Sequence, residues 1–211
     1  MEINGHNKVK RYFIFAFVII LFIVVLVALN RLGTRSGVTD AQVREALPGD
    51  EIIPEPWISI DRAEVLPASA EVVWPWIVQL GKDRGGWYAP LWFENLIHEH
   101  SASSTLPQFQ NLAVGDVVPD WGGGTLKVLE IVPNKYVLYA SQPSTATSTT
   151  KYHFTWALVL EDNTATSTTF HLRLRIPRPS SGFSQYIPPS VLGLIDYATD
   201  RVLFRGLKEN I

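Results

Sequence analysis

Residues 151–176 read KYHFTWALVLEDNTATSTTFHLRLRI and contain two runs in which apolar and polar side chains alternate. Successive side chains of a strand point to opposite faces of a sheet, so each run predicts a strand. We predict a turn between them at Asp162-Asn163. The face that we expect to line a cavity consists of Tyr152, Phe154, Trp156, Leu158 and Leu160 in the first strand and of Phe170, Leu172, Leu174 and Ile176 in the second.

The opposite face of this hairpin is more polar. It carries His153 in the first strand and His171, Arg173 and Arg175 in the second, and we expect these four side chains to face solvent. The cavity surface that the hairpin contributes is therefore apolar, with the hydroxyl of Tyr152 as its polar group. Such a surface suits a hydrophobic ligand.

Further strands and three helices are predicted on either side of the hairpin. The strands cover 57–65, 114–118, 125–132 and 136–141, and the helices cover 67–80, 91–98 and 190–208. The first helix is interrupted by Pro75 and places Val72, Val73, Trp76, Ile77 and Leu80 on one face. The last helix, with Ser190 as its cap, has an apolar stripe made of Leu192, Ile195, Thr199 and Val202, with Ala198 beside it. Because most strands follow one another without helices between them, we expect an α+β fold in which the last helix covers one face of an antiparallel sheet.

Composition excludes several classes of function. The 211 residues carry a formal net charge of -2, which gives no support for binding to nucleic acid. The absence of cysteine excludes disulfides, thiolate metal sites and cysteine nucleophiles. The chain contains no phosphate loop, no Gly-x-Ser-x-Gly elbow and no dinucleotide fingerprint, so we expect no cofactor.

The N-terminal segment predicts a membrane helix. Residues 13–29 are an unbroken apolar run, about 26 Å long as a helix, which is close to the thickness of a bilayer core. A cleaved signal peptide is the alternative, but the run is longer than the apolar part of most signal peptides and lacks a good cleavage site. Three basic residues precede the run and two follow it, which favours a cytoplasmic N-terminus with the large domain outside.

We therefore divide the chain into four parts. These are a short basic tail (1–11), a transmembrane helix (12–30), a linker (31–56) and a folded domain (57–211). The linker is polar, with early glycines and late prolines, and we expect it to hold the domain off the bilayer.

Four stretches of the folded domain resemble the SRPBCC superfamily, the START-like and polyketide cyclase-like helix-grip proteins. They are VWPWIVQLGKDRGGWYAPLWFENL (73–96), LAVGDVV (112–118), TWALVLE (155–161) and LFRGLK (203–208). The resemblance is to an uncharacterised branch of that superfamily and extends from Trp57 to Lys208. It implies a curved antiparallel sheet wrapped around a long C-terminal helix, with a cavity between them. The N-terminal membrane segment is an addition to this pattern, and no set of catalytic residues is carried over.

The stretch GKDRGGWYAPLW (81–92) is predicted to form the rim of the cavity. Two adjacent glycines permit a tight turn that presents Trp87 and Tyr88 to the cavity mouth and leaves Arg84 to bind an anionic group. In the alternative interpretation the two aromatic side chains fill the core, and Arg84 pairs with an acidic neighbour, Asp83 or Glu94. The complete set of predicted ligand-binding residues is Arg84, Trp87, Tyr88, Trp92, Tyr152, Phe154 and Trp156.

Other polar residues are weaker candidates for chemistry. Glu94 and His98 lie one helical turn apart, which permits a metal site or an acid-base pair, but no third metal ligand has a suitable spacing, and we predict no metal. Asp116 follows a glycine at the start of a strand, and we expect it to accept hydrogen bonds from backbone amides.

These observations favour a membrane-tethered protein that binds a small hydrophobic or lipid-like ligand. Two alternatives remain open at this point. One is a polyketide cyclase-like enzyme that acts on a hydrophobic intermediate, and the other is a non-enzymatic interaction module whose pocket is filled by its own tryptophans. The bilayer and the hydrophobic ligand are the expected partners, and nucleic acid is not.

Overall fold

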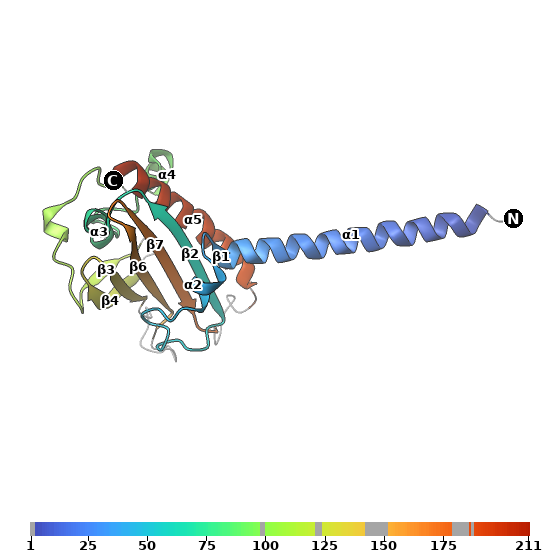
Figure 1. Cartoon of the computed structure of the whole chain (residues 1–211), viewed down its shortest axis with the longest axis horizontal. Coiled ribbons are helices and arrows are strands. Elements are labelled where there is room, and N and C mark those ends of the chain that lie inside the picture. Colours follow the sequence, from blue (N-terminus) through green and yellow to red (C-terminus); the bar gives the residue numbers. More distant parts are fainter. Residues whose placement is uncertain (1–2, 98–99, 121–123, 142–151, 179–185, 187) are drawn as a thin grey trace.

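The computed structural model of the chain describes residues 3–97, 100–120, 124–141, 152–178, 186 and 188–211. Its centre is a curved seven-stranded sheet in the order β1-β2-β7-β6-β5-β4-β3 (Figure 1). Neighbouring strands are antiparallel except β1 and β2, which are parallel. The strands are β1 (Arg35–Ser36), β2 (Ile58–Leu66), β3 (Val117–Pro119), β4 (Thr125–Val132), β5 (Tyr136–Ser141), β6 (Phe154–Thr164) and β7 (Ser167–Ile176).

A long C-terminal helix lies along one face of this sheet, which we call the inner face (Figure 1). The helices are α1 (Ile3–Thr34), α2 (Asp40–Arg44), α3 (Ala70–Val78), α4 (Leu91–Ile97) and α5 (Pro189–Asn210), and Pro107–Phe109 forms one 3-10 turn. This arrangement is an α+β helix-grip fold with an additional apolar helix at the N-terminus. The predicted fold class is confirmed.

The main hydrophobic core lies between the inner face and the helices α3 and α5. Phe170 of β7 meets Phe204 of α5 edge to face, with ring centroids 5.7 Å apart. Leu158 of β6 is fully buried in the same cluster, and truncation of such a leucine to alanine typically costs about 2–5 kcal/mol. The inward-facing set predicted from alternation is correct here, since Phe154, Trp156, Leu158, Leu160, Phe170 and Leu172 all belong to this cluster or pack against it.

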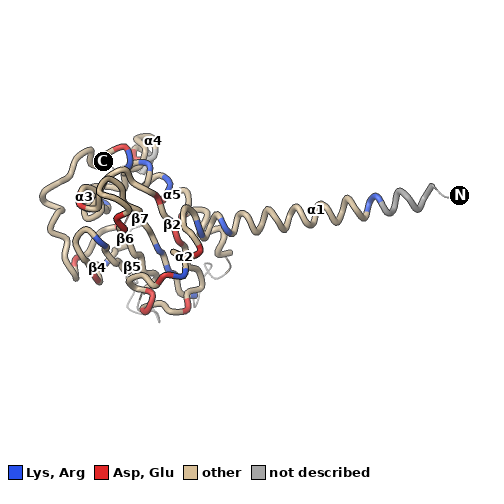
Figure 2. The backbone as a smooth tube through the Cα atoms, viewed as in Figure 1, with Lys and Arg blue, Asp and Glu red and all other residues tan. Residues whose placement is uncertain are grey.

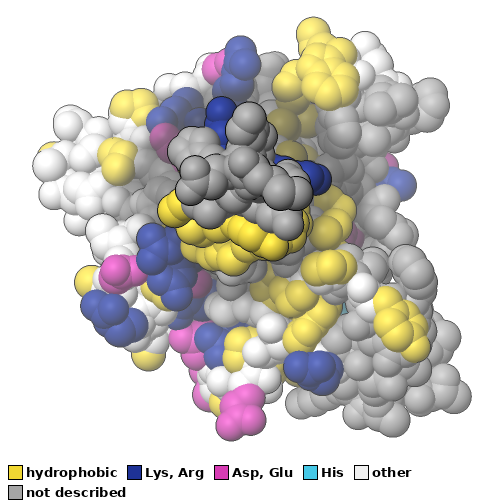
Figure 3. All heavy atoms as spheres, turned by 90° about the vertical axis from the view of Figure 1, so that its right-hand side faces the viewer, with side chains coloured by type: hydrophobic (Ala, Val, Ile, Leu, Met, Phe, Trp, Pro, Cys, Tyr) yellow, Lys and Arg dark blue, Asp and Glu magenta, His cyan; other side chains and the backbone are white. Residues whose placement is uncertain are grey.

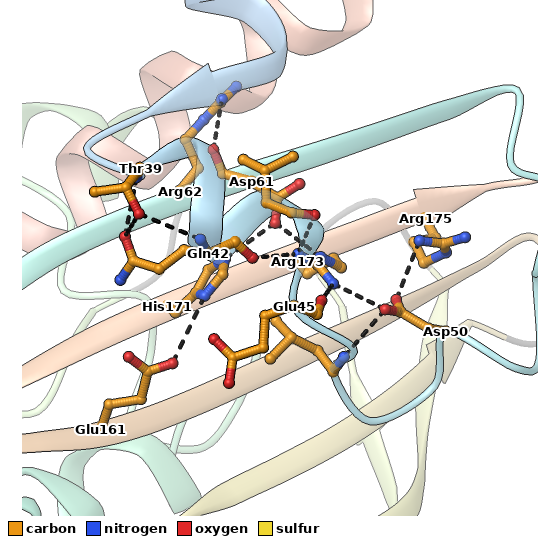
Figure 4. A network of polar contacts seen from close by, with 12 residues as sticks. Thr39, Gln42, Glu45, Asp50, Asp61, Arg62, Glu161, His171, Arg173 and Arg175 are labelled. Carbon is orange, nitrogen blue, oxygen red and sulfur yellow. Dashed lines mark hydrogen bonds and ion pairs between the residues drawn. The ribbon is translucent and has the colours of Figure 1, made fainter.

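The alternation of side chains predicted that the outer face of the sheet is exposed to solvent. In the structure, much of this face is covered. His153 is exposed as predicted, but His171 and Arg173 have only 0% and 2% of their surface accessible. Asp61 of β2 accepts a hydrogen bond from Arg173 Nε at 2.7 Å and lies 3.0 Å from His171 Nε2. Figure 4 shows that this network runs across the strands and under the segment that follows β1.

Residues 35–53 cover this network and are therefore not the free linker that we predicted. The guanidinium of Arg173 donates hydrogen bonds to the carbonyl oxygens of Gln42, Val43 and Glu45 at 2.7–3.0 Å, at the end of α2. Leu47 is buried in a second, smaller apolar cluster on the same face. A cation at the end of a helix satisfies carbonyl groups that have no partner within the helix, which fastens the segment to the sheet.

Three local details also differ from the predictions. In α3, Val72 is exposed, while the other four predicted residues are buried. The β6–β7 hairpin turns between Thr164 and Ser167 and not at Asp162-Asn163, because Asp162 is held inside the sheet by hydrogen bonds from the hydroxyl of Thr168 and the amide of Ala70. The last helix begins one residue before Ser190, and Pro188 occupies the cap position.

The buried stripe of α5 is rotated from the predicted one. Ile195 is 60% exposed, and the buried residues of the helix are Gly193, Asp200, Leu203, Phe204, Gly206 and Leu207. The rotation has a polar cause. The buried guanidinium of Arg62, on the inner face of β2, forms ion pairs with Asp196 and Asp200 and so turns that side of the helix inward.

Helix α1 projects from the domain, yet its last turn is part of the domain (Figure 1). Residues Lys10–Thr34 are long and apolar enough to cross a membrane by length and composition, and an 18-residue window within them has a mean hydropathy of 3.3. Figure 2 shows no charged residue between the two ends of this stretch. The Nη2 atom of Arg62 donates to the carbonyl oxygens of both Gly33 and Gly193, which joins α1 to the start of α5.

Candidate functional site

A cavity of about 300 Å³ lies between α5, the inner face of the sheet and the segment 87–92. Most of its wall is apolar or aromatic, and three aspartates and one threonine supply the acidic and hydroxyl groups. Its lining residues are Trp87, Ala89, Trp92, Asp120, Leu126, Phe154, Trp156, Leu174, Asp196, Ala198, Thr199, Asp200, Val202 and Leu203. The cavity thus lies where the helix-grip fold was expected to have one.

Two tryptophans build the aromatic wall. The rings of Trp87 and Trp156 lie 5.9 Å apart at 39°, and Trp156 lies 6.2 Å from the ring of Tyr139 behind it. Trp156 projects from β6 on the inner face, while Trp87 comes from the turn after α3. Both residues were predicted to contact the ligand, and both line the cavity. Trp87, Trp92 and Trp156 form part of the wall of the cavity and do not fill it.

The acidic part of the cavity comes from α5. Asp196 and Asp200 are one helical turn apart, so their side chains lie on the same side of the helix. An oxygen of Asp196 lies 3.2 Å from Arg62 Nη2, and an oxygen of Asp200 lies 3.7 Å from Arg62 Nε. Arg62 itself has 1% of its surface exposed and packs over the ring of Tyr197.

Burial changes the ionisation of this pair of aspartates. Loss of hydration raises the pKa of Asp196, although Arg62 opposes that change. Burial also raises the pKa of Asp200 well above its ordinary value, and the adjacent charge of Asp196 raises it further. A carboxyl proton retained on Asp200 can be donated to Asp196. The cavity therefore contains a carboxyl group that keeps its proton to a higher pH than a solvated aspartate does.

Tyr88 is a core residue and not part of the rim. Its hydroxyl donates to the carbonyl oxygen of Trp76 at 2.8 Å and accepts from the amide of Gln79 at 2.9 Å, and its side chain is buried. Helix α5 crosses it closely, because a Cβ at Gly206 would lie 1.9 Å from the carbonyl oxygen of Tyr88. Both hydrogen-bonding partners of the hydroxyl are protein groups, so the role in ligand binding that we predicted does not fit this geometry.

Arg84 also serves the structure of the turn. Its guanidinium donates to the carbonyl oxygens of Leu80 and Val78 at the end of α3, and it stacks over the ring of Phe109 at 4.6 Å. Burial lowers the pKa of Arg84. The side chain of Arg84 does not line the cavity, so Arg84 is not placed to bind an anionic group there, contrary to our prediction. These contacts are with carbonyl groups and an aromatic ring, and not with the acidic neighbours of the alternative interpretation.

The other predicted ligand contacts are divided between the cavity and its surroundings. Phe154 lines the cavity, and Trp92 lines it while remaining 69% exposed, which places Trp92 at the mouth. Tyr152 is partly buried just before β6 and is not among the lining residues. We expected the hydroxyl of Tyr152 to be the polar group of the cavity wall. Asp196 and Asp200 of α5 contribute polar groups to that wall instead.

The weaker candidates have structural roles where they are described. Glu94 is buried and accepts a hydrogen bond from the amide of Ser101 at 3.0 Å, while His98 lies outside the described residues. Asp116 accepts from the amide of Ala113 at 2.9 Å, as predicted. Within the part of the chain that the structure describes, no group of three His, Asp or Glu side chains is placed to hold a metal ion.

Arg62, Asp196 and Asp200 were not identified from the sequence. A usable signal exists, because two aspartates four residues apart interrupt the apolar pattern of a helix that covers the core. The prediction considered only the apolar stripe of that helix and did not place the two aspartates. The complementary signal is Arg62, which follows Ile58 and Ile60 on one face of the predicted strand 57–65.

Comparisons with known proteins concern the fold alone. No family model matches the chain, and no curated protein matches it. Among solved structures, the Aha1 dimer from Colwellia psychrerythraea is 15% identical, with 72% of this chain and 94% of that chain covered and a TM-score of 0.44. An HSP90 activator from Plasmodium falciparum is 14% identical over 72% and 94%, with a TM-score of 0.45. A protein from Mycobacterium smegmatis is 12% identical over 72% and 88%, also with a TM-score of 0.45. Likenesses of this size carry no argument about ligand or activity.

Proposed function

We propose that the domain binds a small hydrophobic or lipid-like molecule in the cavity between α5 and the sheet, and that α1 attaches the domain to a membrane. The observation that carries the proposal is the cavity itself, with its volume of about 300 Å³ and its largely apolar wall. Ligand pockets usually measure about 300–1,000 Å³, so the cavity suits a small molecule.

Burial of apolar surface is the main source of affinity in such a site. Each square ångström of apolar ligand surface removed from water contributes about 25 cal/mol, and the loss of ligand freedom offsets part of this gain. The tilted rings of Trp87 and Trp156 offer a flat surface against which an aromatic or alkyl group can lie. Trp92 at the exposed mouth is in a position to contact the ligand as it enters.

Attachment to a membrane is supported by α1. Its apolar stretch has the length of a bilayer core, and basic residues lie near both ends. Figure 3, viewed from the side on which α1 projects, shows hydrophobic side chains near this helix together with both basic and acidic ones. A retained anchor is favoured over a cleaved signal peptide, since Gly33 at the end of α1 is a hydrogen-bonding partner of the buried Arg62. We place the N-terminus in the cytoplasm and the domain outside, following the basic residues.

Native mass spectrometry of the full chain, released from nanodiscs prepared from its own host, tests the proposal. The decisive variant is Ala198→Phe, which adds a ring at an exposed position on the cavity wall. Ile195→Phe is the matched control, because Ile195 is exposed on the same helix and does not line the cavity. We expect a bound hydrophobic molecule in the wild type and the control, and its loss in Ala198→Phe. Equal retention by all three proteins would contradict binding in this cavity.

Catalysis in the same cavity is the second candidate function. The observation that favours it is the raised pKa of Asp200 beside Asp196, because carboxyl groups of this kind act as general acids in enzymes. A polyketide cyclase-like reaction would need such a group to protonate a reacting oxygen. Recovery of the bound molecule chemically unchanged after prolonged incubation distinguishes binding from catalysis.

A further inference from the structure

The polar groups that line the cavity share one sign of charge. Three carboxyl groups, those of Asp120, Asp196 and Asp200, contribute to its wall, and Thr199 adds a hydroxyl. No Lys, Arg or His occurs among the described residues that line it. A ligand whose polar end is a carboxylate or a phosphate would find no cation among these lining residues to replace its lost hydration, and it would lie beside acidic groups.

The cation beside the two aspartates of α5 is already neutralised by the protein. Arg62 lies behind the two aspartates of α5, with ion pairs to both and with hydrogen bonds to the carbonyl oxygens of Gly33 and Gly193. Arg84, the other arginine near this part of the fold, is directed at carbonyl groups outside the cavity. Neither guanidinium is in a position to compensate an anionic ligand.

Arg62 is the one cation paired with Asp196 and Asp200 among the described residues, so a second cation could still bind beside them. Arg62 is the positive group that faces the pair from β2, and Arg201 and Lys208 on α5 are bound instead to Glu64. Burial makes ionisation of Asp200 costly while Arg62 is shared with Asp196. A cationic group placed in the cavity beside Asp200 would lower that cost and would gain a charge-assisted hydrogen bond.

We infer that the cavity selects apolar molecules that carry a primary amine, and discriminates against molecules of the same shape that end in a carboxylate. The amine binds at Asp196 and Asp200, and the apolar body lies between Trp87 and Trp156. This inference rests on the proposed function, because it assigns the polar group of the ligand that the same cavity holds.

Three matched probes separate the possibilities: phenethylamine, phenethyl alcohol and phenylacetate. They share an aromatic ring and differ in the charge of the polar end. Binding is measured by calorimetric titration of the full chain in nanodiscs, with empty nanodiscs as the blank. We expect phenethylamine to bind about tenfold or more tightly than phenylacetate, with the alcohol between them. The comparison uses the wild-type protein, so it does not depend on the folding of a variant.

Asp200→Asn then locates the effect. This change keeps a hydrogen-bonding side chain and removes the carboxyl group, so we expect it to abolish most of the preference for phenethylamine over phenylacetate. Asp83→Asn, at an exposed residue outside the cavity, is the matched control and should behave as the wild type. Phenylacetate binding as tightly as phenethylamine would overturn the inference and leave the proposed function standing. Absence of binding by all three probes would overturn both.

Discussion

Arg62 Nε and a carboxylate oxygen of Asp200 lie 3.7 Å apart in the buried space between β2 and α5. This ion pair connects the sheet to the helix that it grips, and the same aspartate faces the cavity. Burial nevertheless raises the pKa of Asp200 above its ordinary value, so the attraction of Arg62 does not offset the cost of removing the charge from water.

The stability of the protein should therefore depend on the protonation of Asp200. A carboxyl group whose pKa is raised in the folded state contributes stability that is fully present below its unfolded pKa of 3.8 and is lost as the pH rises through its folded value. Asp200→Asn lacks this titration. The melting temperature of the variant minus that of the wild type should therefore increase as the pH rises from about 4. Thermal unfolding of both proteins in nanodiscs over a pH series measures the difference. Curves that stay parallel would contradict the raised pKa, and Asp83→Asn controls for the change in net charge.

The contact between α1 and α5 predicts a second effect. A Cβ at Gly193 would lie 2.1 Å from the carbonyl oxygen of Gly33. Gly→Ala inside a helix normally stabilises a protein by about 1 kcal/mol, but here the clash should reverse the sign and lower the melting temperature. Gly124→Ala is the control, since a Cβ at that position meets no atom within 4 Å. A stabilised Gly193→Ala protein would show that the two helices separate easily.

Two buried tyrosines should respond in opposite ways to loss of the hydroxyl group. Tyr88→Phe removes hydrogen bonds to Trp76 and Gln79 and leaves those buried groups without this partner, which should cost about 1–3 kcal/mol in the free energy of unfolding. The hydroxyl of Tyr139 is buried and has no hydrogen-bonding partner among the described residues, so Tyr139→Phe should be neutral or stabilising. Denaturant titration of the two variants tests this contrast. Equal losses would contradict it.

The cover over the outer face depends on Arg173. Arg173→Leu removes the cation that holds Asp61 and the carbonyl oxygens at the end of α2, and loss of one partner from a buried ion pair typically costs about 3–5 kcal/mol. We expect faster amide hydrogen exchange in residues 40–53, because the segment is no longer fastened to β7. Arg205→Leu, at an exposed position paired with Glu209, should leave that exchange unchanged. Unaltered protection in Arg173→Leu would mean that apolar contacts alone hold the segment.

Much of the sheet is predictable because its signal is local. The β-branched and aromatic runs at 125–132 and 136–141 have the same bounds in the structure, and alternation places Phe154 and Trp156 on the correct face. Alternation cannot reveal what covers a face. Arg173 is buried by carbonyl groups of residues 42–45, which are about 130 positions away in the chain, and no local pattern predicts that contact.

The site is partly predictable for the same reason. Trp87, Trp92, Phe154 and Trp156 line the cavity because aromatic residues near a glycine turn or on an inner strand face are placed by local geometry. Arg84 and Tyr88 come from the same turn, but backbone conformation decides their direction, and Tyr88 has a φ of 53°, which is uncommon for a residue other than glycine. The aspartates of α5 are inward-facing only because Arg62 lies opposite them, and that pairing is tertiary.

The joint between Gly33 and Gly193 has a consequence for how the domain meets other molecules. A domain attached to a membrane through a flexible linker adopts many distances and orientations relative to the membrane surface. Here Arg62 joins the end of α1 directly to the start of α5. With α1 in a bilayer as we propose, the distance between the cavity mouth and the membrane surface would be set by the length and tilt of this helix, and a ligand would have to enter the cavity at that distance.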